Sequence, residues 1–437
     1  MARKVYLSKE QFDSDNTEFN IPYSDDVGIL KEKLTVSGKE ISNRLVCQAM
    51  EGCDGKSDGS PDELTFRRYK RLAESGAGLI WFEATACLEE GRANPRQLCL
   101  REENIDSFKR IVFEIKENSL KKNGKEAVVI MQNTHSGRYS KPDGKPSPLI
   151  AYNNPIFEGD KPIDKSRIMT DFDIDRVSEA LVNNSRLAET AGFDGVDIKC
   201  CHRYLNSELL SAYTREGKYG GSFENRTRLL REAIENSQKV TSASFIVSSR
   251  LNIYDGFPYP YGFGVKPDGS TDVSLEEPIL LIKELNKLGV ELLNITMGNP
   301  YFNPHVNRPF AIGAYQPEEH PLFGVKRMLD SIAEVKKNVP EMKLICSALS
   351  YLGTVAPNVA AAYIKNGGFD FAGFGRTIFA YPDFANDILK DGKMHKEKVC
   401  ICCSKCSEIM RAGSVTGCVV RDKEIYLPLY KEYSERK

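Results

Sequence analysis

The sequence predicts an α/β protein built as a (β/α)8 TIM barrel, with long loop insertions at strand ends and a Cys-rich C-terminal segment. Short apolar runs alternate with amphipathic stretches of helical length along most of the 437 residues, and this alternation indicates a parallel sheet. Eight such runs are each followed by a helical pattern, which favours a closed barrel over an open doubly wound sheet. Hydrophobic residues make up 41% of the chain and charged residues 28%, so we expect a large buried core.

The expected elements follow one another in chain order. The strands lie at residues 45–50, 78–84, 127–132, 195–198, 244–250, 291–295, 343–347 and 369–374. Helical patterns between them include residues 172–190, 224–239, 322–337 and 355–366. We expect residues 1–28 to form an N-terminal extension, 29–395 to form the barrel, and 396–437 to form a Cys-rich segment packed on it.

Two insertions interrupt the alternation. Residues 136–171 are rich in Pro, Asn and Lys, and residues 252–272 contain the stretch YDGFPYPYGFG. Both follow strand ends, where barrel enzymes build their active sites. For the first insertion, surface decoration and a place at the site are equally open. The second carries too many aromatic residues for a purely solvated loop, so we expect it to face a substrate.

The charge balance excludes some classes of partner. Lys and Arg number 60 against 61 for Asp and Glu, which gives no electrostatic case for nucleic acid or for an anionic membrane. The first residues lack the apolar core of a signal peptide, and no run approaches the roughly 20 apolar residues that span a bilayer. We expect a cytoplasmic protein.

The most specific segment begins at the fourth expected strand. GFDGVDIK predicts a buried strand, and CCHRYL then places His202 and Tyr204 just beyond its C-terminal end. Ser222 follows the turn at Gly220 and Gly221, at the position of a helix N-cap. Polar side chains at such a strand end are placed for chemistry.

Residues 219–228, YGGSFENRTR, resemble a helix start found in the old yellow enzyme family of FMN-dependent ene-reductases. Five further segments resemble the same family in the same order. They are NRLVCQAM (43–50), GLIWFEATACLEEGR (78–92), MQNTHSGR (131–138), SSRLN (248–252) and GFGR (373–376). The resemblance implies a barrel that binds FMN and takes electrons from NAD(P)H.

The resemblance also implies which residues bind the flavin ring. Ala49, Met50 and Ala84 are small or pliable enough to line a flat apolar slot. Gln132 offers donor and acceptor groups to the pyrimidine edge of the ring, although an ordinary buried amide is the alternative. Arg250 would stabilise negative charge on the reduced flavin, unless a structural salt bridge occupies it.

The segment GFGR implies a phosphate site at the last strand. Gly375 and Arg376, with the turn around Leu349 and Ser350, would hold the phosphate of FMN through backbone N–H groups and one guanidinium.

Three residues carry the expected catalysis. Tyr204 is the implied proton donor, because a phenol with a pKa of about 10 is neutral at pH 7; a packing role is the alternative. Lys199 stands where the family usually has a His or Asn that binds the substrate carbonyl, and His202 occupies the second polar position. Lys199 either holds that carbonyl and its developing negative charge, or pairs with Asp197 or Asp194 and does no chemistry.

Five of the 12 cysteines fall between residues 400 and 418. Cys400, Cys403 and Cys406 are spaced C-x2-C-x2-C, and Cys418 follows after eleven residues. Thiolate quartets of this style hold [4Fe–4S] clusters, and a subgroup of the family that includes dienoyl-CoA reductases has the similar pattern C-x2-C-x3-C-x11-C. The second gap is one residue shorter here, and Cys402 is an extra thiol that would restore the x3 spacing. Structural zinc and no metal are the alternatives.

We therefore predict an FMN-dependent ene-reductase that uses NAD(P)H to reduce the activated C=C bond of a bulky planar α,β-unsaturated carbonyl compound, of flavone-like, steroid-like or enoyl type. Amine demethylation and NADH oxidation are alternatives with the same cofactor. A Schiff-base aldolase using Lys199 and a catalytically silent electron-transfer or scaffold protein are rivals of other classes. Cluster-bearing relatives often continue into an FAD- and NAD(P)H-binding domain, which we expect to be absent because the sequence ends at Lys437. A separate electron-donor protein is then an expected partner, and oligomerisation stays open.

Overall fold

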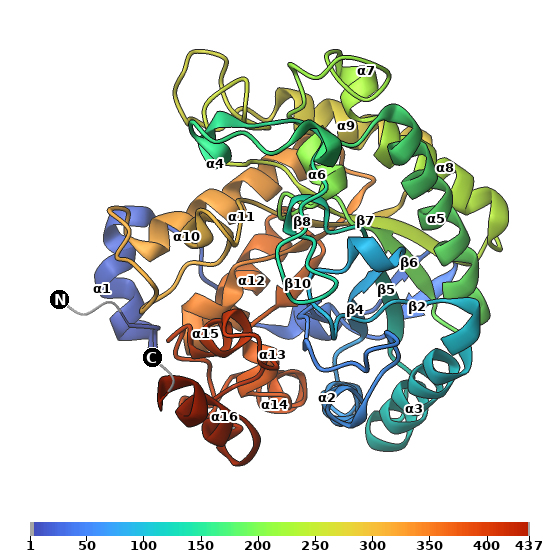
Figure 1. Ribbon diagram of the computed structural model, residues 1–437. Helices are drawn as coiled ribbons and strands as arrows, with labels where there is room; N and C mark the ends of the chain where they lie inside the picture. Colours follow the sequence, from blue (N-terminus) through green and yellow to red (C-terminus); the bar gives the residue numbers. More distant parts are fainter. Residues whose placement is uncertain (1–3, 436–437) are drawn as a thin grey trace.

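A closed barrel of eight parallel strands forms the centre of the computed structural model, which describes residues 4–435 (Figure 1). The strands follow one another around the barrel in chain order, and β10 pairs with β3 to close the ring. They are β3 (Leu45–Cys47), β4 (Leu79–Ala86), β5 (Val128–Thr134), β6 (Gly195–Ile198), β7 (Ile246–Asn252), β8 (Leu292–Thr296), β9 (Lys343–Cys346) and β10 (Phe371–Phe374). Because the ring is closed, every strand pairs on both sides and the barrel has no exposed edge.

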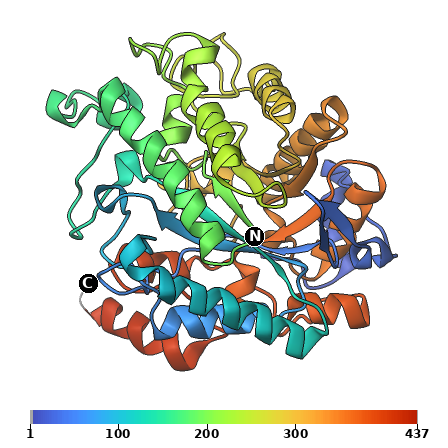
Figure 2. The same ribbon diagram turned by 90° about the vertical axis from the view of Figure 1, so that its right-hand side faces the viewer.

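Helices cover the outside of the barrel, and Figure 2 shows three of the longer ones, α3, α5 and α8, in front of the strands. The longer helices are α1 (Lys9–Phe19), α2 (Glu63–Ala73), α3 (Ile105–Asn123), α5 (Asp171–Thr190), α8 (Arg228–Val240), α9 (Glu276–Lys287), α11 (Pro321–Asn338), α12 (Ala356–Lys365), α14 (Phe384–Asp391) and α16 (Lys423–Glu435). The shorter ones are α4 (Pro155–Glu158), α6 (Leu205–Leu209), α7 (Phe223–Arg226), α10 (Pro304–Asn307), α13 (Thr377–Ala380) and α15 (Lys405–Arg411). The 3-10 turns are η1 (Gly28–Lys31), η2 (Glu89–Gly91), η3 (Glu102–Asn104), η4 (Gly137–Tyr139), η5 (Lys165–Arg167) and η6 (Leu349–Val355). None of the helices within residues 4–435 combines the length and the apolar character needed to cross a membrane.

The strands are buried on both faces, which explains their continuous apolar runs. Every residue of β4 is buried. Val46, Leu79, Trp81 and Ile130 belong to a cluster that fills the barrel interior. The alternate residues of the same strands pack in the core between the barrel and its helices.

All eight predicted strands are confirmed, with ends that differ by a few residues at most. The expected helix at 224–239 is divided at Thr227 into α7 and α8. A two-stranded hairpin, β1 (Leu34–Val36) and β2 (Lys39–Ile41), was not predicted because three-residue strands are too short to show an alternation. Figure 2 shows it on the right, on the side away from the C-terminal helices, so it covers the N-terminal end of the barrel.

The Cys-rich C-terminal segment packs on the barrel beside α13 and α14 (Figure 1). Asp422 accepts hydrogen bonds from Arg67 at 2.8 and 2.9 Å and also pairs with Arg71, and both arginines lie on α2. The backbone N–H of Thr416 donates to the carbonyl of Gly52 at 2.7 Å. The last part of the chain is thereby fixed against the loop that follows the first barrel strand.

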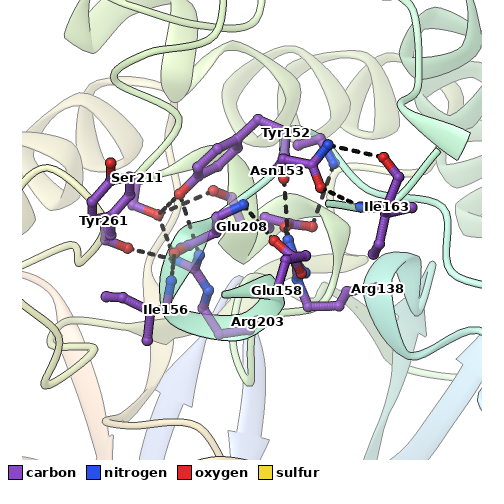
Figure 3. A network of polar contacts seen from close by, with 12 residues as sticks. Arg138, Tyr152, Asn153, Ile156, Glu158, Ile163, Arg203, Glu208, Ser211 and Tyr261 are labelled. Atoms are coloured by element: carbon purple, nitrogen blue, oxygen red, sulfur yellow. Dashed lines mark hydrogen bonds and ion pairs between the residues drawn. The ribbon is translucent and has the colours of Figure 1, made fainter. Parts of the chain in front are cut away.

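The first insertion is fastened by a buried ion-pair network (Figure 3). Arg138 pairs with Glu158 within the insertion and with Glu208 on α6, where its Nε lies 2.9 Å from Glu208 Oε1. All three side chains are at most 6% exposed. Since each charge is buried with its partner, removing one of them would leave the other unpaired.

The second insertion is held by Arg203 and Asp255, whose side chains are buried. Arg203 Nη1 donates to Asp255 Oδ2 at 3.0 Å, and the same oxygen accepts from the backbone N–H of Phe263 at 2.9 Å. One carboxylate therefore organises the fold of residues 252–272 and ties it to the loop after β6.

Replacing Asp255 by Asn should lower the free energy of unfolding by about 3 to 5 kcal/mol, because the buried Arg203 charge loses its partner. Urea denaturation measures this change. Asp272→Asn is the matched control, since Asp272 lies in the same insertion and pairs with Lys266 at the surface, where an ion pair contributes little. Equal stability of the two variants would contradict the assigned role of the buried pair.

Candidate functional site

A cavity opens at the C-terminal ends of the strands, where barrel enzymes carry their catalytic groups. The empty space within it and its open mouth together is about 1120 Å³. The residues predicted from the sequence that line it are Ala49, Met50, Ala84, Gln132, Lys199, His202, Tyr204, Arg250, Ser350, Gly375 and Arg376. The structure thus brings together side chains from β3 to β10 that the sequence separates by more than 300 residues.

Leu349 is the exception among the predicted residues. It begins η6, and its side chain is fully buried in the core. Ala348 has a left-handed backbone with φ of 71°, and the cavity is lined on this side by Ser347, Ala348 and Ser350. The motif identified the turn correctly but not which of its side chains face the cavity.

The prediction that residues 252–272 face the substrate is wrong. This loop contributes no residue to the cavity lining. Its Phe257 instead packs edge-on against Phe157 and Phe302, and the Arg203 guanidinium lies 5.8 Å from its ring. The aromatic residues of this loop cover the buried Arg203 side chain. The cavity is lined instead by residues of the loop after β8, at positions 298–320.

Asp197 organises the floor of the cavity. It points into the barrel from β6 and accepts hydrogen bonds from Trp81 Nε1 at 2.7 Å, Gln132 Nε2 at 2.6 Å and the backbone N–H of Arg250 at 2.6 Å. Burial raises the pKa of this carboxyl group, and the three donors oppose that rise. Gln132 is therefore oriented by Asp197, and its amide oxygen is left for another partner.

Arg250 enters the cavity without a carboxylate partner. Its side chain is 7% exposed, and its buried Nε has no hydrogen-bond partner among the described residues. The structural salt bridge considered from the sequence is not formed within residues 4–435. A buried, unpaired guanidinium is a costly arrangement unless an anion or a polar group binds there.

Lys199, Tyr204 and Tyr301 form a contact chain above this floor. Lys199 Nζ lies 3.7 Å from the centre of the Tyr204 ring, a cation–π distance. The Tyr204 hydroxyl is 2.9 Å from the hydroxyl of Tyr301. Burial and the neighbouring Tyr301 raise the pKa of the Tyr204 phenol well above its ordinary value, so it keeps its proton at neutral pH.

Lys199 is not used in a structural ion pair. Asp197 is occupied by the three donors named above, and Asp194 pairs with Lys39 and Lys116 at 3.2 and 2.9 Å. Within the described residues Lys199 forms no ion pair, which contradicts the alternative that it pairs with either aspartate. Burial lowers the pKa of its ammonium group from the ordinary 10.5.

The loop that carries His202 and Tyr204 has a strained backbone. His202 and Arg203 both adopt positive φ angles, 64° and 59°, which non-glycine residues rarely do. The buried pair of Arg203 with Asp255 holds this conformation in place. His202 Nε2 is buried without a hydrogen-bond partner in the described part of the chain, and burial lowers the pKa of the imidazole well below 6.5, so the ring is neutral.

The cysteines line a second, smaller cavity of about 390 Å³. Its lining includes Cys400, Cys402, Cys403, Cys406 and Cys418. Backbone N–H groups of Cys402 and Arg421 donate to the sulfurs of Cys400 and Cys418 at 3.4 and 3.3 Å, contacts that stabilise thiolates. Cys402 differs from the other four because its thiol donates to the carbonyl of Ser350 at 3.5 Å.

The two cavities share a wall. Arg376, Phe379 and Cys406 border both of them. The sulfur-lined cavity therefore lies directly beside the larger one, and α15, which carries Cys406, forms part of both linings.

Several lining residues were missed from the sequence. Glu51 follows β3 and accepts a hydrogen bond from Asn94 at 2.7 Å, while Tyr301 and Arg308 come from the loop after β8. These residues follow the C-terminal ends of barrel strands, and that position alone could have indicated them from the sequence. No motif distinguishes Arg308 from the many surface arginines, however.

Comparison with known proteins gives the following likenesses. Residues 30–294 match the model of the NADH:flavin oxidoreductase / NADH oxidase family. An NADPH dehydrogenase of a Geobacillus species is 31% identical over 269 residues, which are 60% of this chain and 71% of that protein.

Solved structures share the fold. A 2-naphthoyl-CoA reductase in complex with 2-naphthoyl-CoA superposes with a TM-score of 0.73 at 19% identity, over 93% of this chain and 58% of that one, so this chain spans less than two thirds of its length. An old yellow enzyme homologue from Zymomonas mobilis superposes with a TM-score of 0.61 at 21% identity, over 83% of this chain and 92% of that one. These structural likenesses confirm the predicted (β/α)8 barrel.

Proposed function

The chain belongs to the NADH:flavin oxidoreductase / NADH oxidase family, and on that basis we propose that it is an FMN-dependent ene-reductase that takes electrons from NAD(P)H. The observation that carries the proposal is the composition of the large cavity. An oriented amide and an unpaired guanidinium lie on its floor, and a protonated phenol with a buried ammonium lies above them.

The residues present fit FMN. Two buried guanidinium atoms, Nε of Arg250 and Nη1 of Arg376, have no hydrogen-bond partner in the described structure, and both arginines line the cavity. A Cβ added at Gly375 would meet nothing closer than the sulfur of Met50 at 3.5 Å, so this glycine leaves the floor open to a ligand. We assign Gln132 and Arg250 to the pyrimidine edge of the flavin and Arg376 to its phosphate.

The side chains above the floor complete the chemistry. FMN held by these residues would supply hydride-transfer chemistry toward the electron-poor carbon of a C=C bond, with NAD(P)H as the source of electrons. Lys199 holds the carbonyl oxygen of the substrate and the negative charge that develops there. Tyr204 donates its hydroxyl proton to the neighbouring carbon, and neutral His202 is the second group near the oxygen.

We propose a bulky planar α,β-unsaturated carbonyl compound as the substrate. The support is that Tyr204 and Tyr301, whose rings lie at an interplanar angle of 22°, both line this cavity; the aromatic insertion gives none. The 2-naphthoyl-CoA of the structural neighbour is a flat bicyclic aryl thioester, which is consistent with this shape. Flavone-like, steroid-like and enoyl compounds all satisfy it.

We further propose a [4Fe–4S] cluster bound by Cys400, Cys403, Cys406 and Cys418. Four sulfurs bound to one zinc ion would lie about 3.8 Å apart, given Zn–S bonds of about 2.3 Å. The four cysteines instead line one cavity, where a bulkier iron–sulfur cluster would be held by thiolates on several sides.

Purified protein should show flavin absorption near ~450 nm that bleaches when NADH or NADPH is added without oxygen. A flat aryl enone should then restore the absorption, whereas its saturated product should not. If the enone did not restore the flavin absorption but admission of air did, the protein would be acting as an NADH oxidase instead. A colourless protein that takes up no FMN would contradict the proposal, and borohydride trapping of a carbonyl compound on Lys199 would then support the aldolase.

Lys199→Met should lower kcat/KM for the enone about 10- to 100-fold, the effect of one charge-assisted hydrogen bond. Because only the protonated amine holds the carbonyl charge, wild-type kcat/KM should fall as pH rises through the lowered Lys199 pKa, below 10.5. This alkaline limb should vanish in the variant, since Tyr204 keeps its proton to higher pH. Lys337→Met, on the exposed face of α11, is the control; near-normal rates for Lys199→Met would remove the lysine from the mechanism.

Anaerobically purified protein should contain about four iron and four sulfide per chain, with a broad absorption that EDTA does not remove. Cys406→Ser should lose this iron, whereas Cys402→Ser should keep it because Cys402 bonds Ser350. Loss of iron in Cys402→Ser, with iron retained in Cys403→Ser, would show that Cys402 is the ligand in place of Cys403. One zinc per colourless chain would contradict the cluster.

A further inference from the structure

We infer that Arg308, on the loop after β8, is a second arginine for the phosphate of FMN and acts beside Arg376. The inference rests on the proposed function, because it presupposes bound flavin. It adds a residue from a different part of the chain to the phosphate site, and it gives the loop at residues 298–320 a fixed position relative to the cofactor.

Arg376 has a buried donor atom from which no described residue accepts a hydrogen bond. Its side chain is 5% exposed, and its Nη2 donates to the carbonyl of Pro309 at 2.6 Å. Its Nη1 is buried without a hydrogen-bond partner among the described residues. The Nη2 edge of the guanidinium is therefore bound to the loop, and Nη1 is left to bind a ligand.

Arg308 precedes the proline that Arg376 contacts, so the two arginines are neighbours in space. Both line the large cavity, and Arg308 Nη1 is also buried without a partner in residues 4–435. Two neighbouring guanidinium charges, that of buried Arg376 and that of half-buried Arg308, are unfavourable until an anion lies between them.

The position of the pair points to phosphate. Ser350 and Gly375, at the ends of the last two barrel strands, line the same part of the cavity, and these strand ends are the usual phosphate site of the fold. Lys199 and Tyr204 come from the end of β6 and serve the opposite part. A phosphate dianion can accept hydrogen bonds from two guanidinium groups at once.

The same loop also reaches the proton donor. Tyr301, seven residues before Arg308, hydrogen-bonds Tyr204. Binding of the phosphate by Arg308 would therefore hold both ends of this part of the loop, one on the cofactor and the other on the catalytic phenol.

The test compares FMN with riboflavin, which has the same ring and no phosphate. Full-length protein is freed of flavin, and the quenching of flavin fluorescence gives both dissociation constants. Arg308→Gln should raise the Kd for FMN about 10- to 100-fold, the effect of one charge-assisted hydrogen bond, and should leave the Kd for riboflavin unchanged. Arg308→Lys should recover part of the FMN affinity, because it restores the charge without the planar fork.

Arg96→Gln is the matched control. Arg96 donates to the carbonyl of Gly413 in the C-terminal segment at 3.1 Å and is not among the residues that line either cavity, so this variant removes a positive charge and a contact with the C-terminal segment without changing the pair. It should leave the ratio of the two dissociation constants as in the wild type.

Three outcomes would overturn the inference. Equal weakening of FMN and riboflavin in Arg308→Gln would show a structural role, and loss of iron with normal FMN affinity would show that the arginine serves the cysteine cavity. A normal FMN affinity with a raised KM for an anionic substrate or for NADPH would place Arg308 at the substrate. Failure of the wild type to bind either flavin would instead reject the proposed function itself.

Discussion

The carboxylate of Asp197 is the contact on which the arrangement of this barrel interior depends. It lies on β6 and receives donors from β4, β5 and β7, so a single side chain fixes the relation of four neighbouring strands. The same bonds orient Gln132 and set the backbone of Arg250. A buried charge satisfied by three donors is stable, and its position means that the fold and the floor of the cavity are established by the same interactions.

The walls of the cavity come from segments that lie far apart along the chain. The strained loop after β6 presents Lys199 and Tyr204, and it is held by a salt bridge to the second insertion. The loop after β8 and helix α15 of the Cys-rich segment supply the remaining sides. Strain in the loop after β6 is therefore offset by burial and pairing elsewhere.

The barrel strands could be predicted because strands buried on both faces leave continuous apolar runs that periodicity detects. The predicted site residues on or next to these strands, such as Gln132 and Lys199, line the cavity for the same reason. The loops could not be assigned in this way. Aromatic residues at 252–272 indicated a ligand, but they cover Arg203, and nothing in the sequence shows that Tyr301 and Arg308 turn inward. Those positions depend on contacts between distant segments, which one sequence does not reveal.

The bond from Thr416 to Gly52 has a consequence for how the protein is made. The loop after the first barrel strand leaves the ribosome early, but its partner lies more than 350 residues further along the chain and is synthesised much later. A nascent chain can therefore assemble most of its strands and still lack one wall of the cavity. A chain truncated before residue 416 would expose this unfinished surface, which makes it recognisable to chaperones and proteases before it could hold a reactive cofactor.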